Sequence, residues 1–398
     1  MLSLTEARER VRRLRERWLG RLGTEAVPLG EIAGRAAAEA VCAPEDRPAR
    51  GHATMDGYAF DATEGYPYDL VDAEIFPESD TPEIDPGEAV RIFTGAPLPP
   101  SANAVLKQEA ATIEDGSLSG AAIEPGTYVY ERGSNVAAGE RLVEAGEVLG
   151  PKDALLLGDL GIESVRVRER LSVGLLATGT EIHEGRQRDL DSPMLEGLVR
   201  AWGHEPTYER TVPDEYDRVR DRIGTLAEEH DVVMTTGGTS VGRKDYVVRA
   251  LAELGEVLFH RVRLRPGKPI AVAELDDHDA VAFGIPGKPV GAHAVTALVA
   301  GPFFTGRTAR PTVGATIARD VGIAASGFVY AVPVTLTGGE AMPLGHADSP
   351  LSVYAETFDP SVVSSSTRAT RADGLVLTET ELTAGDPVEV VPYDVLER

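Results

Sequence analysis

The chain has 398 residues, of which 64 are acidic and 39 basic, so its formal net charge is −25 at neutral pH. This charge disfavours DNA and RNA as partners, because binding to nucleic-acid phosphates depends on lysine and arginine. No run of about 18 residues is free of both charge and proline, and Cys42 is the only cysteine, so we expect a soluble, cytoplasmic protein with no membrane partner and no internal disulfide.

The first third of the chain predicts helices followed by short strands. Apolar residues from Leu4 to Leu22 recur at helical spacing among arginines and glutamates, which predicts an amphipathic helix over 5–19. Residues 28–41 begin with proline and continue as an alanine-rich run, which predicts a second helix. Residues 44–135 contain short apolar runs broken by Gly, Pro and Asp, and this pattern predicts a small β-rich domain.

The middle of the chain alternates strands with helices. Four segments are predicted strands, namely 172–182, which is apolar and ends in a glycine turn, 206–211, 231–236 and 280–286. Helical patterns follow these strands, from Pro193 and at 214–230, 247–254 and 289–304. This alternation predicts an open, mainly parallel α/β sheet. From Pro311 onward, apolar residues recur with a period of two, which predicts a β domain.

The predicted fold is therefore a multidomain α/β protein with four parts. A central three-layer α/β domain with a mainly parallel sheet covers 169–308, and a small β-rich domain covers 44–135. A helical and extended linker domain combines 1–43 with 136–168, and a C-terminal β-barrel-like domain covers 309–398.

Four loops that follow predicted strands are rich in glycine, proline and charge, namely 177–181, 211–215, 235–246 and 284–289. Because ligands bind at the carboxyl ends of strands in open α/β sheets, we expect these loops to meet at one edge. Glycines let backbone N–H groups approach an anion, and Glu181, Asp214 and Asp245 offer oxygen ligands suited to Mg²⁺. Each loop alone could be a simple connection, with Asp214 as a helix N-cap and the other two acids as solvated charges. Their joint occurrence favours a site.

Other common catalytic motifs are absent. Lys268 and Lys288 are each followed by proline, so neither belongs to a GxxxxGK[ST] phosphate-binding loop, and no HExxH, GxSxG or strand-linked GxGxxG occurs. The chain has only five lysines, which together with the acidic excess is typical of a protein from a high-salt cytoplasm. Three of these lysines lie in loops rich in Gly and Pro, which marks the loops as candidates for anion binding.

Seven motifs, in this order, resemble those of the MoeA family of molybdenum-insertion enzymes, which also includes the E domain of gephyrin. They are TMDGYA (54–59), FTGAPLP (93–99), VLKQE (105–109), ATGTEI (177–182), TTGGTSVGRKDY (235–246), RPGKP (265–269) and GIPGKPVGA (284–292). The resemblance spans about three quarters of the chain, and the GGTSVG and PGKP blocks are its most specific parts.

The resemblance implies an elongated homodimer whose active site lies between the α/β domain of one subunit and the small β-rich domain of the other. It implies that adenylylated molybdopterin and molybdate or tungstate are substrates and that Mg²⁺ assists the release of AMP. A molybdopterin adenylyltransferase and molybdoenzyme acceptors would be partners.

The resemblance also implies roles for individual residues. The catalytic residues would be Asp56, Thr94, Glu181, Asp245 and Lys268. Asp56 and Thr94 would face the pocket of the partner subunit, while Glu181 and Asp245 would hold Mg²⁺. The substrate would be bound by Thr178, Gly179, Asp214, Gly237, Gly238, Ser240, Arg265, Pro286, Lys288 and Pro289.

Several positions depart from the family pattern, and we expect these changes to cluster at the site. Asn135 stands where the family has the acid of a GED stretch, Lys288 replaces the asparagine of GNP, and Arg265 replaces a lysine. Asp191-Ser192-Pro193 stands for DSN, and Arg368 lies where the family has serine. Three interpretations stay open. The first is a molybdopterin molybdenumtransferase-like enzyme, and the second is a non-catalytic molybdopterin-binding or cofactor-handover paralogue. The third is an enzyme that hydrolyses another nucleotide diphosphate.

Overall fold

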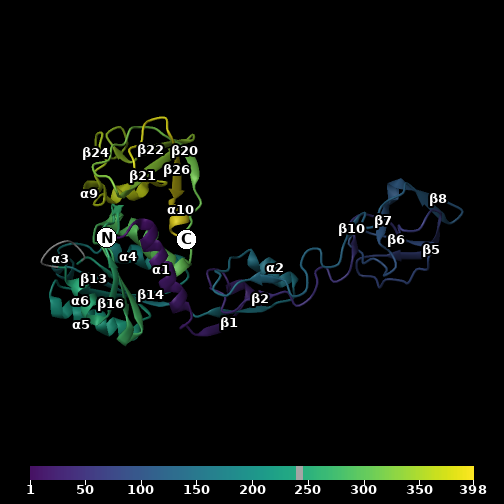
Figure 1. Ribbon diagram of the computed structural model, residues 1–398, viewed down its shortest axis with the longest axis horizontal. Helices are drawn as coiled ribbons and strands as arrows, with labels where there is room; N and C mark the ends of the chain where they lie inside the picture. Colours follow the sequence, from purple (N-terminus) through teal and green to yellow (C-terminus); the bar gives the residue numbers. More distant parts are fainter. Residues whose placement is uncertain (239–244) are drawn as a thin grey trace.

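The computed structural model describes residues 1–238 and 245–398, and the molecule is elongated (Figure 1). A body at one end contains an α/β sheet and the C-terminal β domain, a small β-rich domain forms the other end, and a narrow arm joins them. No helix within the described ranges is long and apolar enough to span a membrane.

A six-stranded sheet forms the centre of the body. Its strands, from one edge to the other, are β14 (Glu205–Val212), β13 (Ser172–Thr178), β15 (Val232–Thr236), β19 (Ala280–Ile285), β18 (Ala271–Leu275) and β16 (Glu256–His260). The first four are parallel to one another, and β18 is antiparallel to both of its neighbours. Strands β15, β18 and β19 are buried at every residue, as expected for a sheet covered on both faces.

Helices cover both faces of this sheet and give it the three layers that the sequence predicts. One face packs against α1 (Leu4–Leu19), α4 (Asp191–Ala201), α7 (Pro289–Val295) and α8 (Gly301–Thr305), and the other against α5 (Tyr216–Glu229) and α6 (Tyr246–Leu254). Alternate residues of a strand face opposite layers, so Met234 packs with the first group and Val233 with the second. A π-helical turn over Thr296–Ala300 joins α7 to α8, and Arg8 donates a hydrogen bond to the Leu298 carbonyl in this turn.

The C-terminal domain is a closed five-stranded barrel. Around it run β21 (Val329–Thr337), β22 (Glu340–Pro343), β20 (Val313–Ile317), β26 (Pro387–Pro392) and β25 (Gly374–Thr378), which pairs with β21 again. The barrel confirms the predicted C-terminal β architecture. Strand β17 (Leu264–Arg265) pairs with β21 and so connects the barrel with the body. The short helices α9 (Pro360–Val363) and α10 (Tyr393–Leu396) of the C-terminal domain are not part of the barrel.

The small β-rich domain contains a second six-stranded sheet. Its order is β7 (Ala104–Lys107), β4 (Gly57–Phe60), β6 (Glu88–Ile92), β5 (Tyr68–Ile75), β9 (Ser117–Gly120) and β8 (Ala111–Glu114). All pairs are antiparallel except β5 with β6. A buried stack of Phe60 on Tyr68, with ring centroids 4.4 Å apart, packs on one side of the sheet.

The arm consists of strands that leave the body and return to it. It contains β1 (Thr24–Pro28) with β12 (Ser164–Arg168), β2 (Val41–Cys42) with β11 (Arg141–Val143), and the helix α2 (Asp153–Asp159). The pair of β3 (His52–Ala53) with β10 (Val129–Tyr130) lies at the far end of the arm and packs against the core of the small domain. Between β1 and β2 the predicted helix over 28–41 is wrong. Only the 3₁₀ turn Leu29–Glu31 forms there, because Ala36 and Ala37 pair instead with Val148 and Val167.

The predicted domain boundaries remain a prediction, and α1 shows why the first of them needs care. The sequence groups 1–43 with the linker, and β1 and β2 do belong to the arm. Helix α1, in contrast, packs in the core of the body, where Leu14 and Trp18 join the same apolar cluster as Phe304.

Candidate functional site

A cavity of about 560 Å³ lies where the α/β sheet meets the C-terminal domain. Three loops of the body line it, at 237–238, 265–269 and 286–288, and the segment 360–364 of the C-terminal domain lines its other side. The first and third loops follow the neighbouring parallel strands β15 and β19, so they leave the sheet at the same edge. The cavity therefore brings together two of the four loops that the sequence predicts to meet, whereas 177–181 and 211–215 are not among its lining residues.

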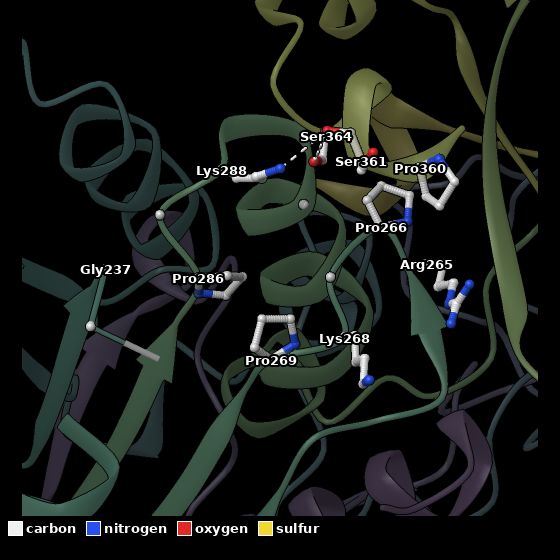
Figure 2. A pocket seen from close by; sticks show the side chains of 14 residues that line it. Gly237, Arg265, Pro266, Lys268, Pro269, Pro286, Lys288, Pro360, Ser361 and Ser364 are labelled. Carbon is white, nitrogen blue, oxygen red and sulfur yellow. Dashed lines mark hydrogen bonds between the residues drawn. The ribbon is translucent and has the colours of Figure 1, made fainter. Parts of the chain in front are cut away.

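Six predicted site residues line this cavity, and they are Gly237, Gly238, Arg265, Lys268, Pro286 and Lys288. Figure 2 shows that the Arg265 and Lys268 side chains are separate from each other and lie on the side of the cavity away from Lys288. The guanidinium of Arg265 lies 4.0 Å from the ring centroid of Phe328, so a cation–π contact already holds this side chain.

Two glycines let the cavity loops pass close to neighbouring chain segments. Gly237 has a φ of 86°, and a Cβ atom there would lie 2.6 Å from the carbonyl oxygen of Thr178. Gly267 has a φ of 108°, and its Cβ would lie 2.9 Å from the Cβ of Val295. Both positions combine a backbone conformation that favours glycine with a lack of space for any side chain.

Lys288 connects the body with the C-terminal domain across the cavity. Its Nζ donates a hydrogen bond of 3.2 Å to the carbonyl oxygen of Ser361 (Figure 2). Lys288 itself is exposed and precedes Pro289, the first residue of α7. The ammonium group thus bridges an exposed lining residue of the body and the C-terminal domain.

The predicted acids Glu181, Asp214 and Asp245 are not among the residues that line the cavity. Asp245 is largely buried, its Oδ2 lies 4.0 Å from Nε2 of His260, and burial raises the pKa of its carboxyl group. Its Oδ1 is buried and accepts no hydrogen bond from any residue that the structure describes. Glu181 belongs to the short helix α3 (Thr180–His183), and its carboxylate lies against Gly179.

A backbone hydrogen bond fixes the position of Asp214. Its N–H donates a 3.0 Å hydrogen bond to Oγ1 of Thr180, which ties the loop after β14 to α3. The N-cap of α5 is Glu215, which makes no side-chain capping bond, so the interpretation of Asp214 as the N-cap is wrong. The neighbouring Thr178 is buried at the end of β13, and its hydroxyl donates to the carbonyl of Thr236 at 3.1 Å.

Among the residues that the structure describes, no group of three or more His, Cys, Asp and Glu side chains is arranged to hold a metal ion. This finding does not exclude Mg²⁺, which usually keeps several waters and binds one or two carboxylates together with phosphate. The Oδ1 of Asp245, which has no donor among the described residues, fits such an ion, since a buried carboxylate oxygen of this kind favours a cation or a water. The predicted ligand Ser240 lies outside the described residues.

Asp56 and Thr94 form a pair at the opposite end of the molecule (Figure 1). The backbone N–H and the hydroxyl of Thr94 both donate to Oδ1 of Asp56, at 2.8 and 2.7 Å, and these bonds lower the pKa of the Asp56 carboxyl group. Both residues are exposed. Within one chain they therefore cannot contribute to the cavity in the body.

The departures from the family pattern do not cluster within one chain, contrary to expectation. Asn135 is an exposed residue of the arm, and its amide donates to Asp159 at 3.4 Å. Arg368 belongs to a 3₁₀ turn over Thr367–Arg371 in the C-terminal domain. Lys288 and Arg265 line the cavity, so only these two changes bear on it directly.

A residue that the sequence did not single out as a ligand, Asp191, lies beside the cavity. It is 6% exposed, burial raises the pKa of its carboxyl group, and its Oδ2 accepts a 2.8 Å hydrogen bond from Thr236. With Pro289 it lines a second cavity of about 410 Å³. The DSP motif marked this position, but nothing in the sequence indicated that its acid is buried.

Pro360, Ser361 and Ser364 of the C-terminal domain were also missed. They line the first cavity from a segment with no motif, about 70 residues beyond the last predicted loop. No signal in the sequence could have found them, because their place depends on how α9 packs against the body.

Comparison with known proteins gives consistent results. Residues 2–161 match the family described as "MoeA N-terminal region (domain I and II)", and residues 174–305 match the "Probable molybdopterin binding domain". The molybdopterin molybdenumtransferase of Haemophilus influenzae is 31% identical over 304 residues, which cover 73% of this chain and 74% of the relative. That of Synechococcus elongatus is 29% identical over 68% of this chain and 72% of the relative. A crystal structure of a molybdopterin biosynthesis MoeA protein from Pyrococcus horikoshii superposes over 99% of both chains with 27% identity and a TM-score of 0.70.

Proposed function

Because the chain belongs to the MoeA family and is a molybdopterin molybdenumtransferase-like enzyme of molybdenum cofactor biosynthesis, we propose that it inserts molybdate or tungstate into adenylylated molybdopterin and releases AMP. The observation that carries this proposal is the cavity itself, in which Lys268 and Lys288 flank glycine-rich loops at the carboxyl edge of the sheet. Cations and closely approaching backbone are what a phosphoanhydride and an oxyanion require.

The chain's own groups suit the cleavage of a phosphoanhydride. Water adds to one phosphorus and the bridging oxygen leaves with the other phosphate, so negative charge grows on the phosphate oxygens. Lys268 and Lys288 would stabilise that charge, and the glycine loops would hold the phosphates. Glu181 and Asp245 would hold Mg²⁺, which supplies further neutralisation of phosphate charge when bound.

We propose a homodimer because the predicted site residues of one chain lie at opposite ends of it. Asp56 and Thr94 are in the small β-rich domain, and Lys268 is in the body (Figure 1). A second copy in antiparallel orientation would bring the small domain of each subunit to the cavity of the other. The exposed position of the Asp56–Thr94 pair supports such a contact.

The direct test measures AMP release from adenylylated molybdopterin by the purified protein in high salt, with Mg²⁺ and with molybdate or tungstate varied. We expect release to depend on one oxyanion and to fall at least about 100-fold in Lys268→Gln, because a charge-assisted contact to phosphate is lost. Lys152→Gln is the matched control, since Lys152 is exposed in the arm and pairs only with Asp153. Equal activity in both variants would contradict the role of Lys268, and unchanged release in Asp245→Asn would contradict the metal role.

The shared site has its own test. Asp56→Asn and Lys268→Gln should each be inactive as pure proteins. When both are co-expressed, mixed dimers would contain one site with both native residues, and about a quarter of the wild-type activity should return. If each chain built its own site, no mixture would regain activity.

A second candidate function is that of a non-catalytic molybdopterin-binding or cofactor-handover paralogue. The hydrogen bond from Lys288 to Ser361 favours it, because this lysine closes the rim where the family has asparagine. In that case the protein would bind adenylylated molybdopterin tightly and release no AMP with either oxyanion.

A further inference from the structure

A second cavity with an unusual buried charge lies at the base of the arm, away from the loops described above. It measures about 440 Å³ and is lined by α1, by the loop at 144–148 and by residues 305–307, which follow α8. Arg15 of α1 lines it, together with Arg12 and Arg307. Figure 1 shows that α1 ends where the arm begins.

Arg15 is buried, and it forms no ion pair with any residue that the structure describes. It lies between Leu14 and Trp18 on the stripe of α1 that faces the core, and it is only 7% exposed. Its buried Nε–H donates no hydrogen bond to any residue in the described part of the chain. No ion pair joins Arg15 to any described acid, although the chain has 64 acidic residues.

The acids around this cavity are engaged elsewhere. Glu16 pairs with Arg12, Glu144 lies 3.4 Å from Arg141, and Glu147 accepts the backbone N–H of Glu144. The buried Arg35 nearby has its own partner, Glu25. Arg15 thus differs from Arg12 and Arg35 in that it joins no ion pair among the described residues, and the attraction of the nearby Glu16 carboxylate offsets only part of the effect of burial.

Two other neighbours of the Arg15 guanidinium carry no negative charge. The guanidinium packs on Gly306, where an added Cβ would lie 3.1 Å from Cζ of Arg15. His204 is neutral, because Leu171 donates to its Nδ1, and Arg15, Arg170 and Arg35 help to lower its pKa. Burial lowers the pKa of Arg15 to about 10, so the group stays protonated at neutral pH.

Burying an unpaired cation costs several kcal/mol, and proteins usually compensate such a charge with a hydrogen-bonded anion. We propose that this cavity is an oxyanion-binding site in which Arg15 is the principal ligand and inorganic phosphate, or a solute of similar size and charge, is the occupant. Arg307, exposed and without an ion pair among the described residues, is the second cation. The exposed Glu16, Glu144 and Glu147 also line the cavity, and their negative charge disfavours a polyanion and limits the site to a small anion.

The bound oxyanion would join two parts of the molecule. Arg15 and Arg307 belong to the body, and the loop at 144–148 belongs to the arm. Gly146 of this loop already contacts Leu19 at the end of α1, where an added Cβ would lie 3.8 Å from Cδ1. Occupancy of the site would therefore stiffen the base of the arm.

The test measures thermal unfolding and calorimetric binding with inorganic phosphate, with potassium chloride adjusted to hold ionic strength constant. We expect phosphate to stabilise the wild type in a saturable way and to bind at least about 10-fold more weakly to Arg15→Met, which keeps the length of the side chain and removes its charge. Without phosphate, Arg15→Met should be at least as stable as the wild type. Arg13→Met is the matched control, since Arg13 is an exposed residue of the same helix that pairs with Glu9.

Three results would overturn the proposal. They are the absence of saturable stabilisation of the wild type, equal stabilisation of Arg15→Met and Arg13→Met, and loss of the effect in Lys268→Gln with its retention in Arg15→Met, which would place phosphate in the first cavity. If Arg15→Met does not fold, Arg307→Met gives the same comparison from an exposed position, and unchanged phosphate affinity in that variant would equally contradict the site. None of these outcomes depends on AMP release.

Discussion

His204 provides a measurable link between pH and the stability of the body. Its Nδ1 accepts a 3.1 Å hydrogen bond from the N–H of Leu171, and its Nε2 lies 3.2 Å from the carbonyl oxygen of Phe304. The neutral ring with its proton on Nε2 satisfies both contacts, whereas a proton on Nδ1 would face the N–H of Leu171. Burial is the main reason that the pKa of His204 falls to about 4, and nearby arginines lower it further.

The direction of the effect follows from proton binding. Between pH 6.5 and 4 the unfolded chain binds a proton at His204 and the folded chain does not, so the free energy of unfolding falls as the pH falls. A difference of about 2.5 pKa units corresponds to about 3 kcal/mol, fully lost at pH 4 and fully present above pH 6.5.

The change to test is His204→Gln, which does not titrate and can keep an acceptor near Leu171. Urea unfolding between pH 7 and pH 4 can be followed by tryptophan fluorescence, because Trp202 stacks on Phe304 at 5.1 Å and Trp18 lies in the same core. The other titrating groups are common to both proteins, so the difference between them isolates His204. We expect the variant to gain about 3 kcal/mol relative to the wild type over this range. Parallel losses of stability in the two proteins would refute the reasoning.

The remaining predictions concern the cavity and the core. Lys288→Asn should weaken binding of adenylylated molybdopterin at least about 10-fold, as measured by calorimetry, because one cation on the rim is lost; unchanged affinity would show that this lysine only holds the C-terminal domain. Gly267→Ala should lower the free energy of unfolding by about 1–3 kcal/mol and reduce AMP release, because its Cβ has no room. Gly87→Ala is its control, with a φ of 81° and nothing within 4 Å of the added Cβ, and an equal loss in both would contradict the steric argument. Glu274→Gln should destabilise the body by about 1 kcal/mol in urea, because it breaks the 2.5 Å ion pair with Arg17; no change at low salt would mean that the pair contributes nothing.

The sequence predicts the elements of the body well because its local patterns and its tertiary packing agree. The run at 231–236 is apolar throughout and becomes β15, buried on both faces. Its last residues lead into the glycine loop of the cavity, so parallel topology alone predicts that Gly237 and Pro286 meet. The expectation from the MoeA motifs and the geometry coincide at these positions.

The failures arise where distant segments decide the structure. The alanine-rich run at 28–41 has helical composition, but its backbone pairs with Val148 and Val167, more than 100 residues away in the chain. The sequence around Asp191 is typical of a polar loop, and the burial of this residue depends on how α4 packs beside β15. Ser361 reaches the cavity only because α9 packs against the body. Propensity and spacing carry no information on such contacts.

The chain enters and leaves the distal sheet at adjacent points, where the N–H of Arg47 donates to the carbonyl of Val136 at 2.8 Å. The small domain is thus an insertion whose two ends already touch, and a short turn could replace it without stretching the rest of the fold. The same geometry makes the small domain a segment that could be exchanged as a unit. Exchange of the segment between relatives would transplant the surface that carries Asp56 while leaving the body's own core untouched.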